Sequence, residues 1–200
     1  MFNHALGLMV QPSLQWQRVA DLPPPTMKTM VLFPAIMAVL PAAAWYYGTT
    51  NVGWTVGDGG AIRLTADSAL TLIILFYCAM VGSVAVIGYF IHWMSKTYGA
   101  DSNLAKGIVI AGFTATPLFV AGAVGFYPVL WLDMLIGVVA VCWSVYLLYL
   151  GIPIVMRIPE ERGFLFSSAV IAICLVILVC ILVGSVILWD FGAGPAFTDA

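Results

Sequence analysis

Five long apolar segments dominate the chain, and polar residues fall almost entirely between them. The segments cover residues 29–47, 68–94, 107–126, 128–156 and 164–189, and Asp133 is the only Asp, Glu, Lys or Arg inside any of them. Each segment is long enough to cross a hydrocarbon core of about 30 Å as a helix. The pattern predicts an all-α membrane protein with five transmembrane helices.

The composition supports a lipid environment. Charged residues make up 8% of the chain and the mean hydropathy is +1.08, whereas soluble domains carry about 25% charged residues. With a net charge of −2 and no basic stripe, the chain is not expected to bind nucleic acid. The four cysteines lie inside apolar segments without metal-ligand spacing, so we expect them to be small buried apolar residues.

The distribution of basic residues predicts the orientation. One side of the membrane holds six of the seven, and the other side holds only Arg63. The six are Arg18, Lys28, Lys96, Lys106, Arg157 and Arg162. By the positive-inside rule, the N-terminus is cytoplasmic, the chain crosses five times, and the C-terminus lies outside.

Three regions follow from this pattern. Residues 1–28 form a cytoplasmic segment with a short interfacial helix near residues 14–21, for which Ser13 could provide the N-cap. Within that helix, Trp16 and Arg18 suit the lipid headgroup zone. Residues 29–190 form the transmembrane domain, and residues 191–200 are expected to be a flexible tail.

Asp133 is the sharpest candidate for chemistry. It lies five residues after Pro128, which is about 7 Å along a helix, and a carboxylate at that depth usually faces the protein interior or a water path. It could bind a cation, relay a proton, or accept hydrogen bonds from Tyr127 or Trp131. The alternative is a carboxylate at the outer interface, stabilised by the start of the fourth helix.

Two further residues inside the apolar segments are candidates. Pro117 removes a backbone hydrogen bond, so it could create a hinge or line a cavity; such kinks are also ordinary in membrane helices. His92 could carry protons near the cytoplasmic end of the second segment. Its alternative role is that of an interfacial histidine hydrogen-bonded to its surroundings.

The stretch Tyr146–Phe164 predicts a tight cytoplasmic hairpin between the last two helices. Gly151 and Pro153 weaken the end of the fourth helix, and a polar turn follows with Arg157, Glu160, Glu161 and Arg162. The arginines could reach lipid phosphates or pair with the glutamates. The turn is either a helical connection with basic anchors or a docking edge for a partner or an acidic lipid.

Catalytic patterns are missing from the sequence. It contains no HExxH, GxSxG, P-loop or Rossmann fingerprint, so we expect neither an enzyme nor a cofactor. Small residues four apart, such as Ala79 with Ser83 and Ala140 with Ser144, permit close helix packing. That packing could occur within the chain, with membrane-protein partners or in a homo-oligomer.

The chain resembles the Yip1 family of five-pass membrane proteins, in its bacterial form. The resemblance rests on Trp143–Phe164, reading WSVYLLYLGIPIVMRIPEERGF, on Pro12 and Trp16 before the first crossing, and on the five-helix topology. It covers about residues 16–189. The resemblance, the short chain and the lack of an organelle signal imply a bacterial inner membrane.

The resemblance implies a fold and little chemistry. Eukaryotic relatives are associated with small GTPases and membrane traffic, but their acidic-tyrosine-glycine motif has no clear counterpart here; the nearest string is Asp21-Leu22-Pro23. The first hypothesis is therefore a non-enzymatic protein that organises membrane partners or lipids. The alternative is a small permease or channel with Asp133 near the pathway.

Overall fold

The fold is built from helices. The computed structural model describes residues 2–22, 27–55, 60–100 and 102–198. The α-helices are α1 (Phe2–Val10), α2 (Pro12–Ala20), α3 (Met27–Tyr47), α4 (Ala66–Ser95), α5 (Leu104–Thr114), α6 (Thr116–Ala121), α7 (Leu130–Met156) and α8 (Glu160–Leu188). Shorter helical turns are η1 (Gly48–Val52), η2 (Gly122–Phe126) and η3 (Trp189–Ala193).

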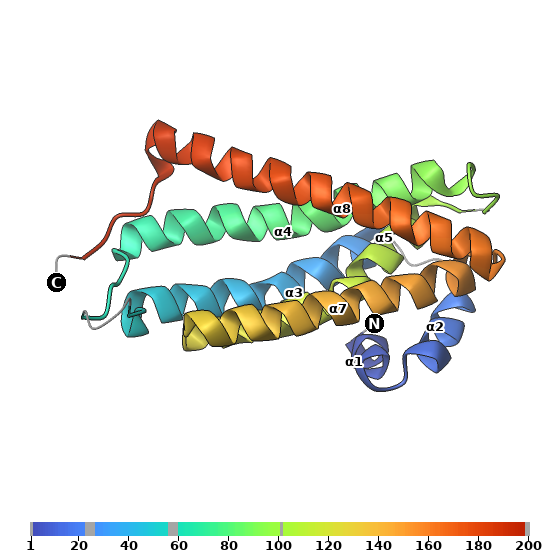
Figure 1. Ribbon diagram of the computed structural model, residues 1–200, viewed down its shortest axis with the longest axis horizontal. Coiled ribbons are helices and arrows are strands. Elements are labelled where there is room, and N and C mark those ends of the chain that lie inside the picture. Colours follow the sequence, from blue (N-terminus) through green and yellow to red (C-terminus); the bar gives the residue numbers. More distant parts are fainter. Residues whose placement is uncertain (1, 23–26, 56–59, 101, 199–200) are drawn as a thin grey trace.

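Five helical stretches are long and apolar enough to cross a membrane, as the sequence predicts. They are Val31–Val52, Ala66–Ser95, Leu104–Phe126, Leu130–Met156 and Glu160–Ala193. The long helices run along the long axis of the molecule, and α1 and α2 lie near one end (Figure 1). The hairpin between α7 and α8 lies at that same end, which we call the hairpin end. We call the opposite end the outer end, after the orientation that the basic residues predict.

The third crossing is interrupted where the sequence places Pro117. Helix α5 ends at Thr114 and α6 begins at Thr116, because proline has no N–H to continue the ladder. The hydroxyl of Thr116 donates to the carbonyl of Gly112 at 3.4 Å. A threonine therefore satisfies part of the freed backbone, as expected for a proline inside a membrane helix.

Glycines let neighbouring helices touch through their backbones. A Cβ on Gly88 of α4 would lie 2.6 Å from the Cα of Ile108 in α5. At the outer end, Gly122 packs against Pro41, and Gly48 packs against the carbonyl of Gly125. Each contact joins segments of different crossings and leaves no room for a side chain.

Two parts of the N-terminal region differ from expectation. Residues 2–10 form α1, which the sequence pattern did not predict, and His4 Nδ1 lies 3.2 Å from Gln15 Oε1 of α2. The helix expected near residues 14–21 exists as α2, but its N-cap is Gln11 rather than Ser13, and Pro12 occupies the first turn. Proline is favoured there because its fixed φ suits the first helical position.

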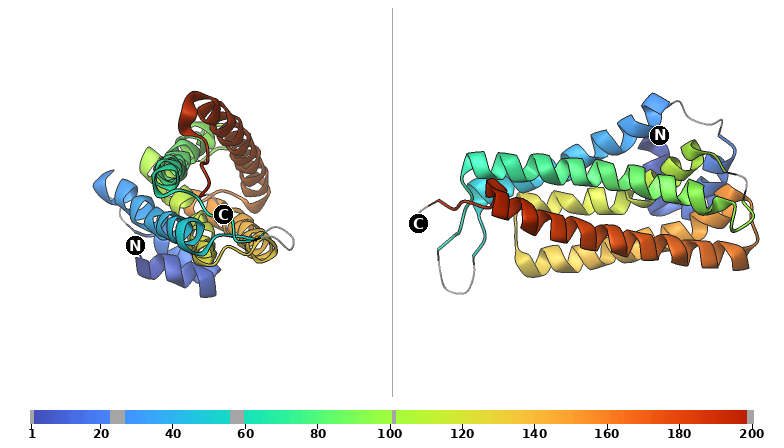
Figure 2. Two further views of the ribbon diagram at one scale, coloured as in Figure 1. Left: turned by 90° about the vertical axis from the view of Figure 1, so that its left-hand side faces the viewer. Right: turned by 90° about the horizontal axis from the view of Figure 1, so that it is seen from above.

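The C-terminal tail, for which the sequence predicts flexibility, pairs with the loop before α4. The N–H of Thr65 donates to Ala196 O at 2.9 Å, and the N–H of Thr198 donates to Arg63 O at 3.0 Å. Ser68 Oγ accepts the N–H of Ala196 at 2.9 Å. The tail thus runs back from α8 to the start of α4 at the outer end (Figures 1 and 2).

Replacing Gly88 by alanine should destabilise the bundle. The new Cβ would meet the backbone of Ile108 at 2.6 Å, so α4 and α5 must move apart, at a cost of about 1–3 kcal/mol. We expect a lower midpoint of thermal unfolding for the purified protein in detergent. The matched control is Gly82→Ala on the same helix, where a Cβ meets nothing within 4 Å. Equal midpoints for the two variants would contradict the close contact.

Candidate functional site

The hairpin between α7 and α8 reverses the chain through Arg157. This residue is in the left-handed region (φ 53°, ψ 45°), which costs on the order of 1 kcal/mol for a non-glycine residue. The N–H of Ile158 donates to Pro153 O at 3.2 Å, and Pro159 then precedes α8. Glu160 and Glu161 lie in the first turn of α8, where the helix dipole favours negative charge.

Trp16 is buried inside the protein and is not exposed to lipid headgroups, which corrects the expectation from sequence. Its side chain is 0% exposed. A Cβ on Gly151 of α7 would lie 2.6 Å from its indole ring, and the Phe113 ring packs edge-on at 6.2 Å. Gly151 thus provides space for Trp16, which docks α2 against α7.

An ion pair also joins the N-terminal segment to the hairpin. Arg157 Nη2 lies 3.4 Å from Asp21 Oδ1, with side chains 72% and 77% exposed. Such an exposed pair contributes about 0–1 kcal/mol, so the buried Trp16 contact carries more of the docking. Among the described residues, Arg157 forms its ion pair with Asp21 and not with Glu160 or Glu161.

Arg162 and the turn after α4 meet beside the hairpin. Gly99 has a φ of +73°, and a Cβ added to it would lie 2.7 Å from Arg162 Nη1. The guanidinium therefore packs against the glycine. The rings of Tyr98 and Phe166 are stacked at 4.7 Å with an interplanar angle of 6°. The expected docking residues Arg157, Glu160, Glu161, Arg162 and Arg18 are all exposed, at the hairpin end of the molecule.

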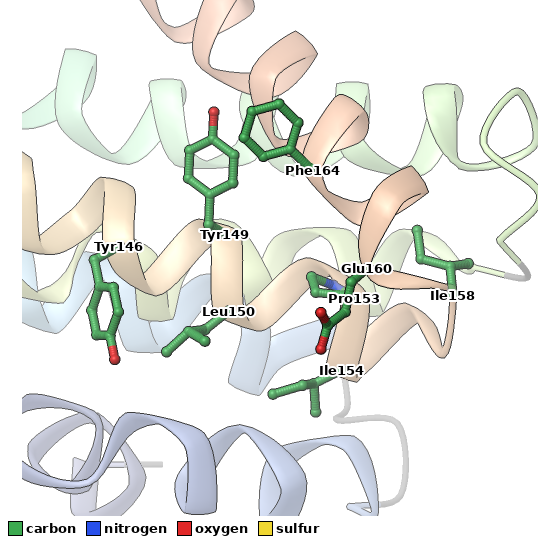
Figure 3. A pocket seen from close by; sticks show the side chains of 8 residues that line it. All are labelled: Tyr146, Tyr149, Leu150, Pro153, Ile154, Ile158, Glu160 and Phe164. Carbon is green, nitrogen blue, oxygen red and sulfur yellow. The ribbon is translucent and has the colours of Figure 1, made fainter.

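A groove of about 630 Å³ lies along the hairpin (Figure 3). We call it the hairpin groove; it is lined by Tyr146, Tyr149, Leu150, Pro153, Ile154, Ile158, Glu160 and Phe164. The Tyr149 hydroxyl lies 2.9 Å from Ser168 Oγ. In Figure 3, Glu160 contributes a carboxylate among apolar and tyrosine side chains. The groove therefore offers apolar walls beside a charged turn.

The surroundings of Asp133 have features of both alternatives that the sequence left open. It lies in the first turn of α7, yet its Oδ1 is buried and has no hydrogen-bond partner among the described residues. It lines a cavity of about 460 Å³, the Asp133 cavity. The other lining residues are Pro41, Trp45, Phe76, Met80, Ser83, Val84, Ile87, Ala111, Ala115, Leu118, Phe119, Ala121, Gly122, Val124, Gly137 and Leu178.

The remaining candidates from the sequence do not gather around Asp133. Tyr127 and Trp131 are 67% and 68% exposed, as expected for aromatic residues at a membrane interface. Pro117 lines a separate cavity of about 330 Å³. His92 lies in the last turn of α4, towards the hairpin end, and its buried Nδ1 has no partner among the described residues.

Two hydroxyls that sequence reasoning missed line a second cavity beside the first. Thr114 and Ser144 each have a buried hydroxyl oxygen without a partner among the described residues. Both line an otherwise apolar cavity of about 400 Å³, which we call the tail cavity; it lies between helices and is not part of the C-terminal tail. A hydroxyl within a long apolar segment was the available signal, but many such hydroxyls bond their own helix, so sequence alone could not separate these two.

Metal binding finds no support in the part of the chain that the structure describes. There, no three His, Cys, Asp or Glu side chains come close enough to hold a metal ion. The arrangement at the Asp133 cavity can instead receive a positive charge or a hydrogen-bond donor from a bound molecule.

The fold defines the class of the protein: an α-helical, multi-pass membrane protein with five helices able to span the bilayer. A family model described as the Yip1 domain matches residues 6–181, so the chain belongs to the Yip1 family. Inner membrane protein YohC of Escherichia coli strain K12 is 44% identical over 157 residues, which are 78% of this chain and 80% of YohC. YohC of Escherichia coli O6:H1 gives the same values.

No solved structure matches the chain. The relatives and the five spans together identify a multi-pass inner-membrane protein, as expected from the sequence. The predicted membership of the Yip1 family is confirmed.

Replacing Gly151 by alanine should release the N-terminal helices from α7. The new Cβ would lie 2.6 Å from the Trp16 ring, so α2 must shift or detach. We expect trypsin to cut the exposed Arg18 several times faster in the detergent-purified variant, measured by mass spectrometry of the released peptide. The matched control on the same helix is Gly137→Ala, where a Cβ meets nothing within 4 Å. Equal cleavage rates in the two variants would disprove the docking role of Gly151.

Proposed function

We propose that this protein is a non-enzymatic membrane protein that organises lipids through its hairpin end, and that the lipids are anionic phospholipids. The observation that carries the proposal is the hairpin groove together with Arg157 and Arg162, which are exposed in the same hairpin but do not line the groove itself. An apolar groove suits an acyl chain, and arginine suits a phosphate. Membrane-protein partners could use the same surface.

The charges around the groove favour a phosphate at the turn rather than deep in the groove. Glu160 lines the groove itself, and its carboxylate would repel an anionic headgroup. Arg157 lies in the turn beyond it and is 72% exposed. The acyl chain would therefore follow Tyr146, Leu150 and Ile154, with the phosphate at Arg157 and Arg162.

The docked N-terminal helices reach the charged turn. Helix α2 is held against α7 by Trp16, and Asp21 extends from its end to Arg157. Asp21 competes with a phosphate for Arg157, so the ion pair would lower the affinity of the turn for a phosphate.

The proposal requires the hairpin end to face the cytoplasm, the orientation that the basic residues favour. Green fluorescent protein fused to the N-terminus should therefore be fluorescent in bacterial cells. Alkaline phosphatase fused to the C-terminus should be active, because it matures only outside the cytoplasm. The reverse pattern would place the hairpin on the outer face and exclude this orientation.

Replacing both Arg157 and Arg162 by glutamine should reduce the amount of bound phosphatidylglycerol. Each arginine contributes a charge-assisted contact of about 1.5–3 kcal/mol to a buried phosphate and less to an exposed one. We expect a fall of about tenfold in affinity, measured by native mass spectrometry of the protein titrated with phosphatidylglycerol.

Two variants serve as controls for this measurement. Arg63→Gln removes a basic residue at the outer end and should leave the affinity unchanged. Asp21→Asn removes the ion pair but keeps Arg157, so binding should be retained or strengthened. If the double variant binds as much phosphatidylglycerol as the native protein, the hairpin is not the lipid site.

A second candidate function is a small permease or channel with Asp133 near the pathway. The observation that favours it is the partnerless Oδ1 of Asp133 on an interhelical cavity. Asp133→Asn should then reduce the flux of a translocated cation across liposomes that contain the protein. An unchanged flux would remove Asp133 from this hypothesis.

A further inference from the structure

The lining of the Asp133 cavity combines one carboxylate with aromatic rings. Asp133, Trp45 and Phe76 all face it, from three different helices. None of the residues that line it is basic. A carboxylate in such surroundings lacks a counter-charge, and aromatic faces attract cations, ammonium groups in particular.

The tail cavity continues the Asp133 cavity towards the hairpin end. The two share Ile87, Ala111, Ala115, Leu118 and Leu178 in their linings. The tail cavity is apolar except for the hydroxyls of Thr114 and Ser144, which have no partner among the described residues. Ser144 is only 7% exposed. Apart from these two hydroxyls the lining offers apolar contacts, so the cavity suits an apolar chain.

We propose that the two cavities form one binding site for a single-chain amphiphilic cation. Its ammonium group would lie between Asp133 and the aromatic rings, and its apolar chain would follow the tail cavity to Ser144. The site is separate from the hairpin groove and does not depend on the lipid-organising role. It also defines a ligand class that the permease hypothesis leaves open.

The chemistry of the lining argues against a phospholipid amine. In an ethanolamine lipid, a phosphate follows the ammonium group by two carbon atoms. That phosphate would enter a cavity with a carboxylate and no basic lining residue, where like charges repel strongly. A cation without a phosphate satisfies Asp133 and meets no such repulsion.

The helices leave a lateral route for such a molecule. Helices α7 and α8 meet at the hairpin and diverge towards the outer end (Figures 1 and 2). In this outer half of α8, Leu175 and Leu178 line the cavities and are also 58% and 51% exposed. An amphiphile dissolved in the bilayer could therefore enter beside α8 without passing through water.

The test uses two fluorescent probes that differ by one charged group. Diphenylhexatriene is neutral, and its trimethylammonium derivative is an amphiphilic cation. The full-length protein is placed in nanodiscs of phosphatidylglycerol, and energy transfer from tryptophan to each probe is measured against empty nanodiscs. We expect saturable transfer to the cationic probe, with affinity at least about tenfold above that for the neutral probe, the equivalent of one charge-assisted contact.

Three variants distinguish the site from general partitioning. Asp133→Asn should abolish the preference for the cation and leave the neutral probe unaffected. Gly137→Leu should weaken the binding of both probes, because the new side chain would project into the Asp133 cavity. Gly137 lines this cavity, and a Cβ added there meets nothing within 4 Å. Gly184→Leu is the control, because a Cβ added to Gly184 also meets nothing within 4 Å and Gly184 lines neither cavity.

The outcomes separate this site from its alternatives. A native protein without saturable transfer, or an Asp133→Asn variant that keeps the preference for the cation, would overturn the proposal. Equal affinity for both probes would assign the cavities to a neutral chain. Competition by phosphatidylethanolamine added to the nanodiscs would assign them to an ethanolamine lipid. Neither of these last two results bears on lipid binding at Arg157 and Arg162.

Discussion

Close backbone contact at glycines holds the transmembrane helices together. In lipid, an apolar side chain gains little by moving from the surroundings into the bundle, so association depends on packing. Gly88 brings α4 to the backbone of α5, and Gly122 and Gly125 bring η2 against α3. Helix α8 has few such contacts beyond its first half, and most of its outer side chains are exposed. The contrast explains why α8 diverges from the other helices and why cavities remain beside it.

The hairpin end is organised by one aromatic residue. Trp16 reaches from α2 onto Gly151, and Phe113 of α5 packs on the same indole. A single side chain thus joins α2 of the N-terminal segment, α5 of the third crossing and α7 of the fourth crossing. The charged turn at Arg157 is held next to this contact through Asp21. This arrangement fixes α2 against α7, while the hairpin groove itself is lined by residues of α7, α8 and the turn between them.

Much of the fold was predictable because the bilayer imposes strict requirements on a sequence. Apolar length identified the five crossings, and Pro117 marked the interruption of the third. The N-terminal region was less predictable. An indole beside Arg18 suits either the headgroup zone or a protein interior, and only the space above Gly151 decides between them. Helix α1 was missed because it is short and mostly apolar. Its buried residues, such as Ala5 and Leu8, do not alternate with polar residues at a helical period that the sequence would reveal.

The sequence by itself determined the class, the family and the positions of the crossings, since each depends on local composition or on a contiguous motif. It also singled out Asp133, because a carboxylate in an apolar segment is visible without any structure. Only the tertiary structure decided what Asp133 faces. Trp45 of α3 and Phe76 of α4 line the same cavity as Asp133 of α7, although these helices are distant in the chain. Helix rotation and the divergence of α8 set this arrangement, and both arise from packing across the whole bundle.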